Sequence, residues 1–177
     1  MPPIASSGRP CHLTPESTWW RNFARNGLTS VDKPSSDFEE LFRCLNARNV
    51  NAIIVGGHAL AFHGRPRFTK GLDVFVEPTD DNAARLIRAL DDFGFGTVGL
   101  RVEDFSQPGR IVQLGVAPNR IDLLTVIDGV TFLDAWQHRV AGHFGGEPVF
   151  YFGRDEFIRN KRAVGRPQDL ADIDALI

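Results

Sequence analysis

The chain has 177 residues, of which 42% are hydrophobic, and these include 14 Phe and 3 Trp. Such a composition provides a hydrophobic core and excludes a globally disordered chain. No apolar run approaches the roughly 20 residues of a membrane-spanning helix, and no continuous apolar leader is visible, so we expect a cytoplasmic protein. The two cysteines form no disulfide framework, and the formal net charge of −2 excludes a global basic field that recruits nucleic acid.

The chain divides into an N-terminal arm, residues 1–35, and one domain, residues 36–177. The arm holds 5 of the 11 prolines, and its apolar residues follow no period apart from a cluster at Trp19, Trp20 and Phe23. A terminal segment of this kind either packs on the domain or binds a partner, and both interpretations stay open.

The first half of the domain alternates between helical and strand patterns. Apolar residues recur at helical spacing from Ser36 to about Arg48, and a short buried strand follows at Asn51–Val55. The pattern then predicts a short helix at His58–Phe62, a strand at Leu72–Val76, a helix at Asp81–Phe93 capped by Thr79, and a strand at Arg101–Phe105.

The second half begins with two strands that Pro118 and Asn119 separate, which favours an antiparallel pair. The predicted elements are strands at Ile111–Leu114 and Arg120–Val126, a helix at Phe132–His138, a strand at Val149–Phe152, and helices at Arg154–Arg162 and Pro167–Leu176. This mixture predicts an α+β fold in which helices flank a mixed or antiparallel sheet.

Two predicted strands carry an aspartate between apolar neighbours. Asp73 interrupts the run LDVFV, and Asp122 interrupts RIDLLTV. Burying an unpaired carboxylate costs several kcal/mol, so two such acids require a compensating cation. That cation is either Arg or a hard divalent metal such as Mg²⁺, which takes one or two carboxylates together with substrate phosphates. The alternative is an acid at an exposed strand end, or one paired with Arg65, Arg67 or Arg120.

Gly56 and Gly57 follow a predicted strand and precede a predicted helix. Backbone N–H groups at a helix start point outward, and the helix dipole favours an anion there. A Gly-Gly pair alone mostly indicates a tight turn. Followed by two strands that each carry an aspartate, it indicates a site for a phosphate and a metal.

Three stretches follow one another in the order VGGHALAFHGRPRFTKGLDVFV, RIDLL and NKRAVGRPQDLADIDAL. Together they resemble the minimal nucleotidyltransferases of the DNA polymerase beta superfamily, in particular small bacterial proteins related to AbiEii-type toxins. The resemblance covers about residues 38–177 and implies a nucleotidyltransferase-like fold. It implies that Gly56 and Gly57 hold an NTP and that Asp73 and Asp122 bind Mg²⁺. The implied acceptor is a hydroxyl of RNA, protein or a small molecule, and an antitoxin is an implied partner.

The resemblance also implies an acid that this chain lacks. The family pattern TKDLD reads TKGLD here, so Gly71 stands where the first metal-binding carboxylate is expected, and we predict weak or absent catalysis. Three explanations stay open: a natural protein that binds nucleotide without activity, an Asp→Gly variant, or replacement by a nearby acid such as Glu77 or Asp80. The alternative function is therefore a catalytically inactive module that binds a nucleotide or a partner.

Lysine is rare among the 20 basic residues, and two of the three lysines, Lys70 and Lys161, fall in these motifs. The resemblance implies that Lys161 is catalytic and contacts phosphate, and that Lys70 and Arg166 bind the nucleotide. It also implies that the segment that carries Arg166, Asp169 and Asp172 orients the site. The alternative is an ordinary surface helix with an Arg166–Asp169 pair at i,i+3 spacing.

The candidate site makes a geometric prediction. Asp122 must lie beside Asp73 on a neighbouring strand, and Lys161 must reach the same cleft close to Gly56 and Gly57. Because clustered carboxylates repel one another, we expect Lys161 or a nearby Arg to offset their charge.

Overall fold

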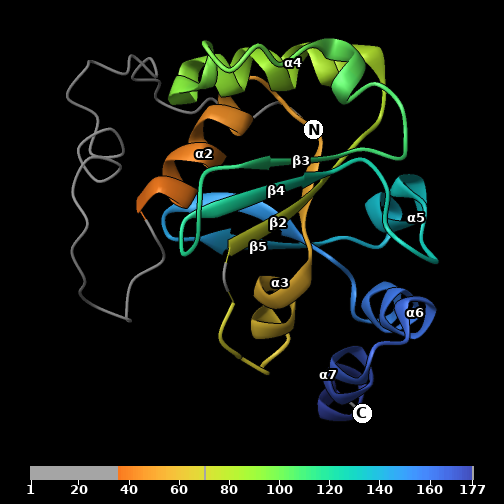
Figure 1. Ribbon diagram of the computed structural model, residues 1–177. Coiled ribbons are helices and arrows are strands. Elements are labelled where there is room, and N and C mark those ends of the chain that lie inside the picture. The colour runs from red at the N-terminus through yellow and green to blue at the C-terminus, as the bar shows by residue number, and fades with distance from the viewer. Residues whose placement is uncertain (1–35, 70, 177) are drawn as a thin grey trace, which may run out of the picture.

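The computed structural model describes residues 36–69 and 71–176 and has the predicted α+β fold (Figure 1). Its sheet is mixed and six-stranded, in the order β3-β4-β2-β1-β6-β5. The N-terminal arm and Lys70 lie outside the described residues. The strands are β1 (Ala52–Ile54), β2 (Gly71–Val76), β3 (Ile111–Leu114), β4 (Arg120–Leu124), β5 (Val140–Phe144) and β6 (Glu147–Tyr151).

Helices cover both faces of the sheet (Figure 1). One apolar core packs α2 and α4 on one face, and a second packs α3, α5, α6 and α7 on the other. The helices are α2 (Ser36–Ala47), α3 (Gly56–Phe62), α4 (Asp80–Leu90), α5 (Phe132–Gln137), α6 (Arg154–Val164) and α7 (Pro167–Leu176), with a π-helical turn at Asp91–Phe95 and a 3₁₀ turn at Val102–Asp104.

Strand pairing fixes which side chains face the second core. Strands β2 and β4 run parallel, and their register pairs Asp73 with Asp122. Leu72 and Val74 are fully buried in the core under α2 and α4. Because strand side chains alternate, Asp73 points toward the opposite face, where α3, α6 and α7 lie.

Several expected elements are confirmed, including the antiparallel pair β3–β4 and the helix Pro167–Leu176. The expected strand Arg101–Phe105 is wrong, because residues Val102–Asp104 form a 3₁₀ turn. The Asp104 carboxylate accepts a hydrogen bond of 2.9 Å from the Arg101 backbone N–H. This local hydrogen bond stabilises the turn.

Strand β5 was not predicted. Its sequence VAGHF has a glycine and a histidine in place of a clear apolar alternation, and it forms because β6 pairs with it antiparallel. Within the described part of the chain, no helix is long and apolar enough to cross a membrane.

Candidate functional site

Asp73 and Asp122 lie side by side on two interior strands of the sheet. They are register partners in the parallel pair β2–β4, whose backbones lie about 4.8 Å apart. Asp122 is buried and Asp73 is half-buried. The structure thus brings together the two acids that the sequence singled out, on the same face of the sheet.

Asp122 has two side-chain partners. Arg120 Nη2 donates to Asp122 Oδ2 at 2.7 Å, and Gln113 Nε2 donates to Oδ1 at 3.0 Å. Arg120 lies two residues before Asp122 on β4, so both side chains project from the same face. The ion pair with Arg120, which was one of the alternatives for the strand acids, is therefore present.

The environment of Asp73 favours its neutral form. Burial raises the pKa of Asp73 to about 6, and the charge of Asp122 and a hydrogen bond between the two carboxyl groups add to the rise. The charges of Arg120 and Lys161 act in the opposite direction and lower this pKa. The two acids therefore repel each other, and the charges of Arg120 and Lys161 act against that repulsion.

Gly71 pairs directly with Arg120 across β2 and β4. A Cβ at position 71 would overlap the carbonyl oxygen of Arg120 and lie 3.1 Å from its Cβ. A carboxylate at this position, as the resemblance implies, does not fit unless the two strands separate. The pairing of β2 with β4 in this chain is therefore built around a glycine.

Gly56 and Gly57 form the first turn of α3 and do not precede it as expected. Gly56 has a φ of 61°, and a Cβ on it would overlap the Asp73 carboxylate. The backbone at the start of α3 thus lies directly against Asp73. Val55, the N-cap residue, makes no side-chain capping hydrogen bond, so the first N–H groups of α3 have no cap among the described residues.

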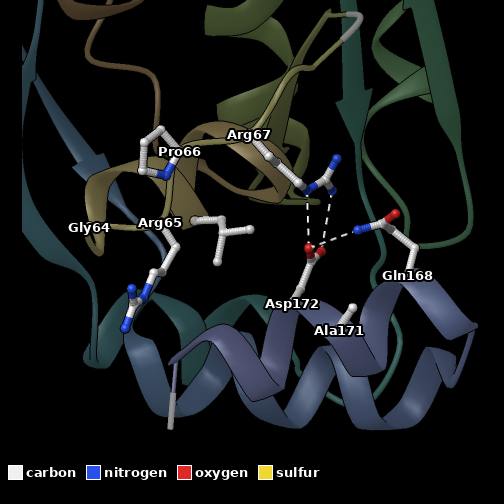
Figure 2. A pocket seen from close by; sticks show the side chains of 8 residues that line it. Gly64, Arg65, Pro66, Arg67, Gln168, Ala171 and Asp172 are labelled. Carbon is white, nitrogen blue, oxygen red and sulfur yellow. Dashed lines mark hydrogen bonds and ion pairs between the residues drawn. The ribbon is translucent and has the colours of Figure 1, made fainter.

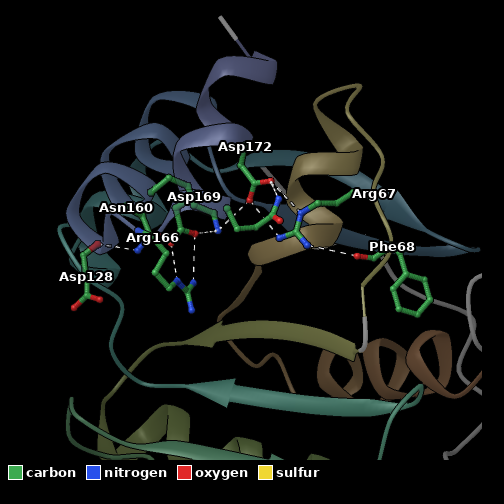
Figure 3. A network of polar contacts seen from close by, with 9 residues as sticks. Arg67, Phe68, Asp128, Asn160, Arg166, Asp169 and Asp172 are labelled. Carbon is green, nitrogen blue, oxygen red and sulfur yellow. Dashed lines mark hydrogen bonds and ion pairs between the residues drawn. The ribbon is translucent and has the colours of Figure 1, made fainter.

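Lys161 belongs to a buried ionic network that joins α6 and α7. Figure 3 shows its two acids, Asp169 and Asp172, with their arginine partners. Its Nζ atom lies 2.6 Å from Asp169 Oδ1 and 3.3 Å from Asp172 Oδ2. The side chains of Lys161 and Asp169 are only 8% and 1% exposed. The ammonium group therefore pairs with Asp169 and Asp172, and it acts on Asp73 only through space.

Two arginines form the more exposed part of this network. Arg166 Nε donates to Asp169 Oδ2 at 2.7 Å, and Arg67 Nε lies 3.1 Å from Asp172 Oδ1. Burial by itself raises the pKa of Asp169, but the hydrogen bonds and charges of Arg166 and Lys161 outweigh it and lower the pKa to about 2. The predicted Arg166–Asp169 pair is thus present, and Asp169 is held in its charged form.

A cavity of about 400 Å³ lies between the segment after α3 and helix α7 (Figure 2). Arg65, Arg67, Gln168 and Asp172 are among its lining residues. A second cavity, of about 460 Å³, is mostly apolar and adjoins the ends of β2 and β4 near Phe75 and Val126. Asp73 and Asp122 line neither of these cavities.

Neither Glu77 nor Asp80 replaces the missing acid. Glu77 follows the far end of β2, four residues or about 13 Å along the strand from Asp73. Its carboxylate accepts a hydrogen bond of 2.8 Å from Asn51 Nδ2. Asp80 is the first residue of α4, on the opposite face of the sheet.

Sequence reasoning did not assign Gln113 to the site, and it named Arg67 and Arg120 only as alternative partners of the strand acids. Gln113 lies on β3 opposite Asp122, which no residue spacing reveals before the β3–β4 register is known. The alternation of side chains along RIDLL does place Arg120 on the face of Asp122, so this signal was available in the sequence.

The acid pair fits one divalent cation. Two adjacent carboxylates are a donor set that Mg²⁺ accepts when substrate phosphates and water complete its ligands. Among residues 36–69 and 71–176, no group of three or more His, Cys, Asp or Glu side chains is placed to hold a metal ion. The residues present therefore do not fit two metals that share protein carboxylates.

No protein-family model matches this chain, and no curated protein matches it. Function is therefore inferred from the geometry of the site.

Proposed function

We propose that this chain is a nucleotidyltransferase-type protein that binds Mg²⁺ and an NTP at Asp73 and Asp122 and transfers a nucleotidyl group slowly to a hydroxyl acceptor. The observation that carries the proposal is the close approach of Gly56, at the uncapped start of α3, to the carboxylate of Asp73, whose register partner is Asp122. Amides that favour phosphate thus lie next to an acid pair that favours a divalent cation.

In this proposal the acidic residues would bind the cation, and the amides and the basic residue would bind the phosphates. Asp73 and Asp122 would hold Mg²⁺, which when bound supplies positive charge to the phosphates and the acceptor oxygen. The amides of Gly56 and Gly57 would face the triphosphate. Arg166, 70% exposed and fixed by Asp169, would add positive charge at the mouth of the site.

The proposed reaction is an in-line displacement at the α-phosphate. The acceptor hydroxyl oxygen forms a bond to the α-phosphorus while the bond to the bridging oxygen breaks. Pyrophosphate leaves with that electron pair, and the hydroxyl proton passes to water. An RNA end, a protein side chain or a small molecule supplies the hydroxyl.

Gly71 is the reason for the low rate. Removing one group that stabilises transition-state charge typically lowers a rate by about 10²–10³. The site has two carboxylates where the family pattern has three. We therefore expect the protein to bind NTP but to transfer the nucleotidyl group slowly.

A second candidate is a nucleotide-binding module that performs no transfer. The pairing of Gly71 with Arg120 favours it, because the space of the absent acid is filled by backbone. In this case Mg²⁺ and NTP bind at Asp73 and Asp122, and the bound state is recognised by a partner.

Transfer from each of the four α-³²P-labelled NTPs to RNA and to protein pools tests both candidates. Calorimetry with and without Mg²⁺ measures NTP binding on the same samples, and Asp73→Asn/Asp122→Asn is the matched control. Binding with transfer that the double variant loses supports the first candidate. Binding without transfer supports the second, and an absence of Mg²⁺-dependent binding for every NTP overturns both.

A further inference from the structure

We infer that Arg120 is a phosphate-binding residue of this site. In this inference the site binds phosphate with one divalent cation and with the guanidinium of Arg120. The inference rests on the proposed function. In the protein without nucleotide Arg120 pairs with Asp122, and when cation and NTP bind it pairs with the triphosphate.

The position of Arg120 brings its side chain to the acid pair. It lies opposite Gly71 in the β2–β4 register and two residues before Asp122 on the same strand. Because Gly71 has no side chain, nothing on β2 stands beside Arg120 at this register position. Arg120 Nη2 reaches Asp122 Oδ2 at 2.7 Å while its side chain stays 34% exposed.

The number of carboxylates in the site favours one cation. Asp73, Asp122 and Arg120 together carry −1 when both acids are ionised, and one divalent ion changes this to +1. A second divalent ion would make it +3, and no third carboxylate is placed to hold that ion in the described part of the chain. A net charge of +1 facing a triphosphate is therefore reached with a single Mg²⁺ and Arg120.

The guanidinium is able to change partners. Only Nη2 contacts Asp122, and Nε is buried without a hydrogen-bond partner among the described residues. A cation that takes the Asp122 carboxylate removes the anion from Arg120. The planar fork of arginine then binds phosphate through two parallel N–H groups, which is the geometry that makes arginine a phosphate ligand.

Arg120→Gln separates the two roles because they predict shifts of opposite sign. Mn²⁺ binding is measured by electron paramagnetic resonance, alone and with inorganic triphosphate or the α,β-methylene analogue of each NTP. We expect Mn²⁺ alone to bind up to about fivefold tighter, since a partly exposed ion pair that competes for Asp122 is gone. We expect Mn²⁺-triphosphate to bind about 10- to 100-fold weaker, since a charged hydrogen bond to phosphate is lost.

Arg88→Gln is the matched control, because Arg88 is exposed on α4, on the opposite face of the sheet. It should change neither measurement, and thermal melts establish that each variant is folded. One Mn²⁺ per wild-type chain in the ternary complex supports the inference. Two Mn²⁺ per chain, or an Arg120→Gln variant that binds Mn²⁺-triphosphate as tightly as the wild type, overturns it.

Failure of the proposed function gives a different result. If Asp73→Asn/Asp122→Asn binds Mn²⁺ and triphosphate as the wild type does, the site lies elsewhere and both proposals fall. If the double variant loses binding but Arg120→Gln keeps it, the proposed site stands and the role of Arg120 is rejected.

Discussion

Gly71 lies so close to Arg120 that the two strands which carry them leave no room for a side chain. A Cβ at position 71 would overlap the Arg120 carbonyl oxygen, which belongs to a strand backbone and is not the mobile end of a side chain. The residue that sets this chain apart from the pattern it resembles is therefore also a packing residue of the β2–β4 pair.

Replacing Gly71 should destabilise the protein. We expect Gly71→Ala and Gly71→Asp each to lower the free energy of unfolding by about 1–3 kcal/mol, because overpacking forces the backbone to shift. We expect no faster transfer in Gly71→Asp. Urea unfolding and the labelled-NTP transfer assay measure the two effects.

Gly146→Ala is the control for this series. A Cβ there would lie 3.1 Å from Glu39 Oε1, the end of a flexible side chain, so we expect little change. A Gly71→Asp variant that is as stable as the wild type and transfers faster would show that β2 and β4 accept the acid.

Removing both carboxylates should leave the fold intact. We expect Asp73→Asn/Asp122→Asn to unfold at the same or a higher temperature than the wild type at pH 7. The repulsion and the burial of charge that raise the pKa of Asp73 are relieved, while Arg120 loses only a partly exposed ion pair. Binding of Mg²⁺ and NTP should be lost. Thermal melts with and without Mg²⁺-NTP measure both, and a large drop in melting temperature with unchanged binding would make these acids structural.

Local sequence patterns predicted the fold class and the shared face of Asp73 and Asp122. The alternation in LDVFV and RIDLL predicted which face Asp73 and Asp122 share, because a period of two is a property of the strand itself. The β2–β4 register, which makes them neighbours, is a tertiary property that no spacing encodes. The same holds for β5, which forms only by pairing with β6.

The ion-pair partners of the charged residues were harder to predict from the sequence. Lys161 was expected at the cleft of Asp73 and Asp122, but it pairs with Asp169 and Asp172, eight and eleven residues further along the chain. A turn at Gly165, with a φ of 68°, folds α7 back on α6 and brings these acids to the lysine. Helical spacing alone does not predict contacts across such a turn.

The pH dependence of stability should report on Asp73. Its pKa in the folded protein, about 6, is above the ordinary value of 3.8, so the folded state binds this proton more tightly than the unfolded state. The stabilising effect is complete below about pH 4 and is lost as the pH rises through about 6. We therefore expect Asp73→Asn to gain stability relative to the wild type as the pH rises from 4 to 7. Urea unfolding across this range measures the difference, and parallel profiles for the two proteins would contradict it.

Lys161 should matter for stability because it neutralises two buried acids. In Lys161→Met, Asp169 and Asp172 keep only Arg166 and Arg67 as cationic partners among the described residues, and both arginines are more exposed than the lysine. Removing one partner of a buried ion pair costs about 3 kcal/mol or more, which in a chain of this size lowers the melting temperature by about 6–12 °C.

Arg162→Met is the matched control, since Arg162 is the next residue on α6, carries the same charge and is exposed. We expect it to change stability by less than about 0.5 kcal/mol. A double-mutant cycle between Lys161→Met and Asp172→Asn should give a coupling energy, because each variant removes the same contact. If Lys161→Met melts like Arg162→Met but binds NTP more weakly, the lysine contacts phosphate as the resemblance implies. Its pairs with Asp169 and Asp172 would then not be what holds it in place.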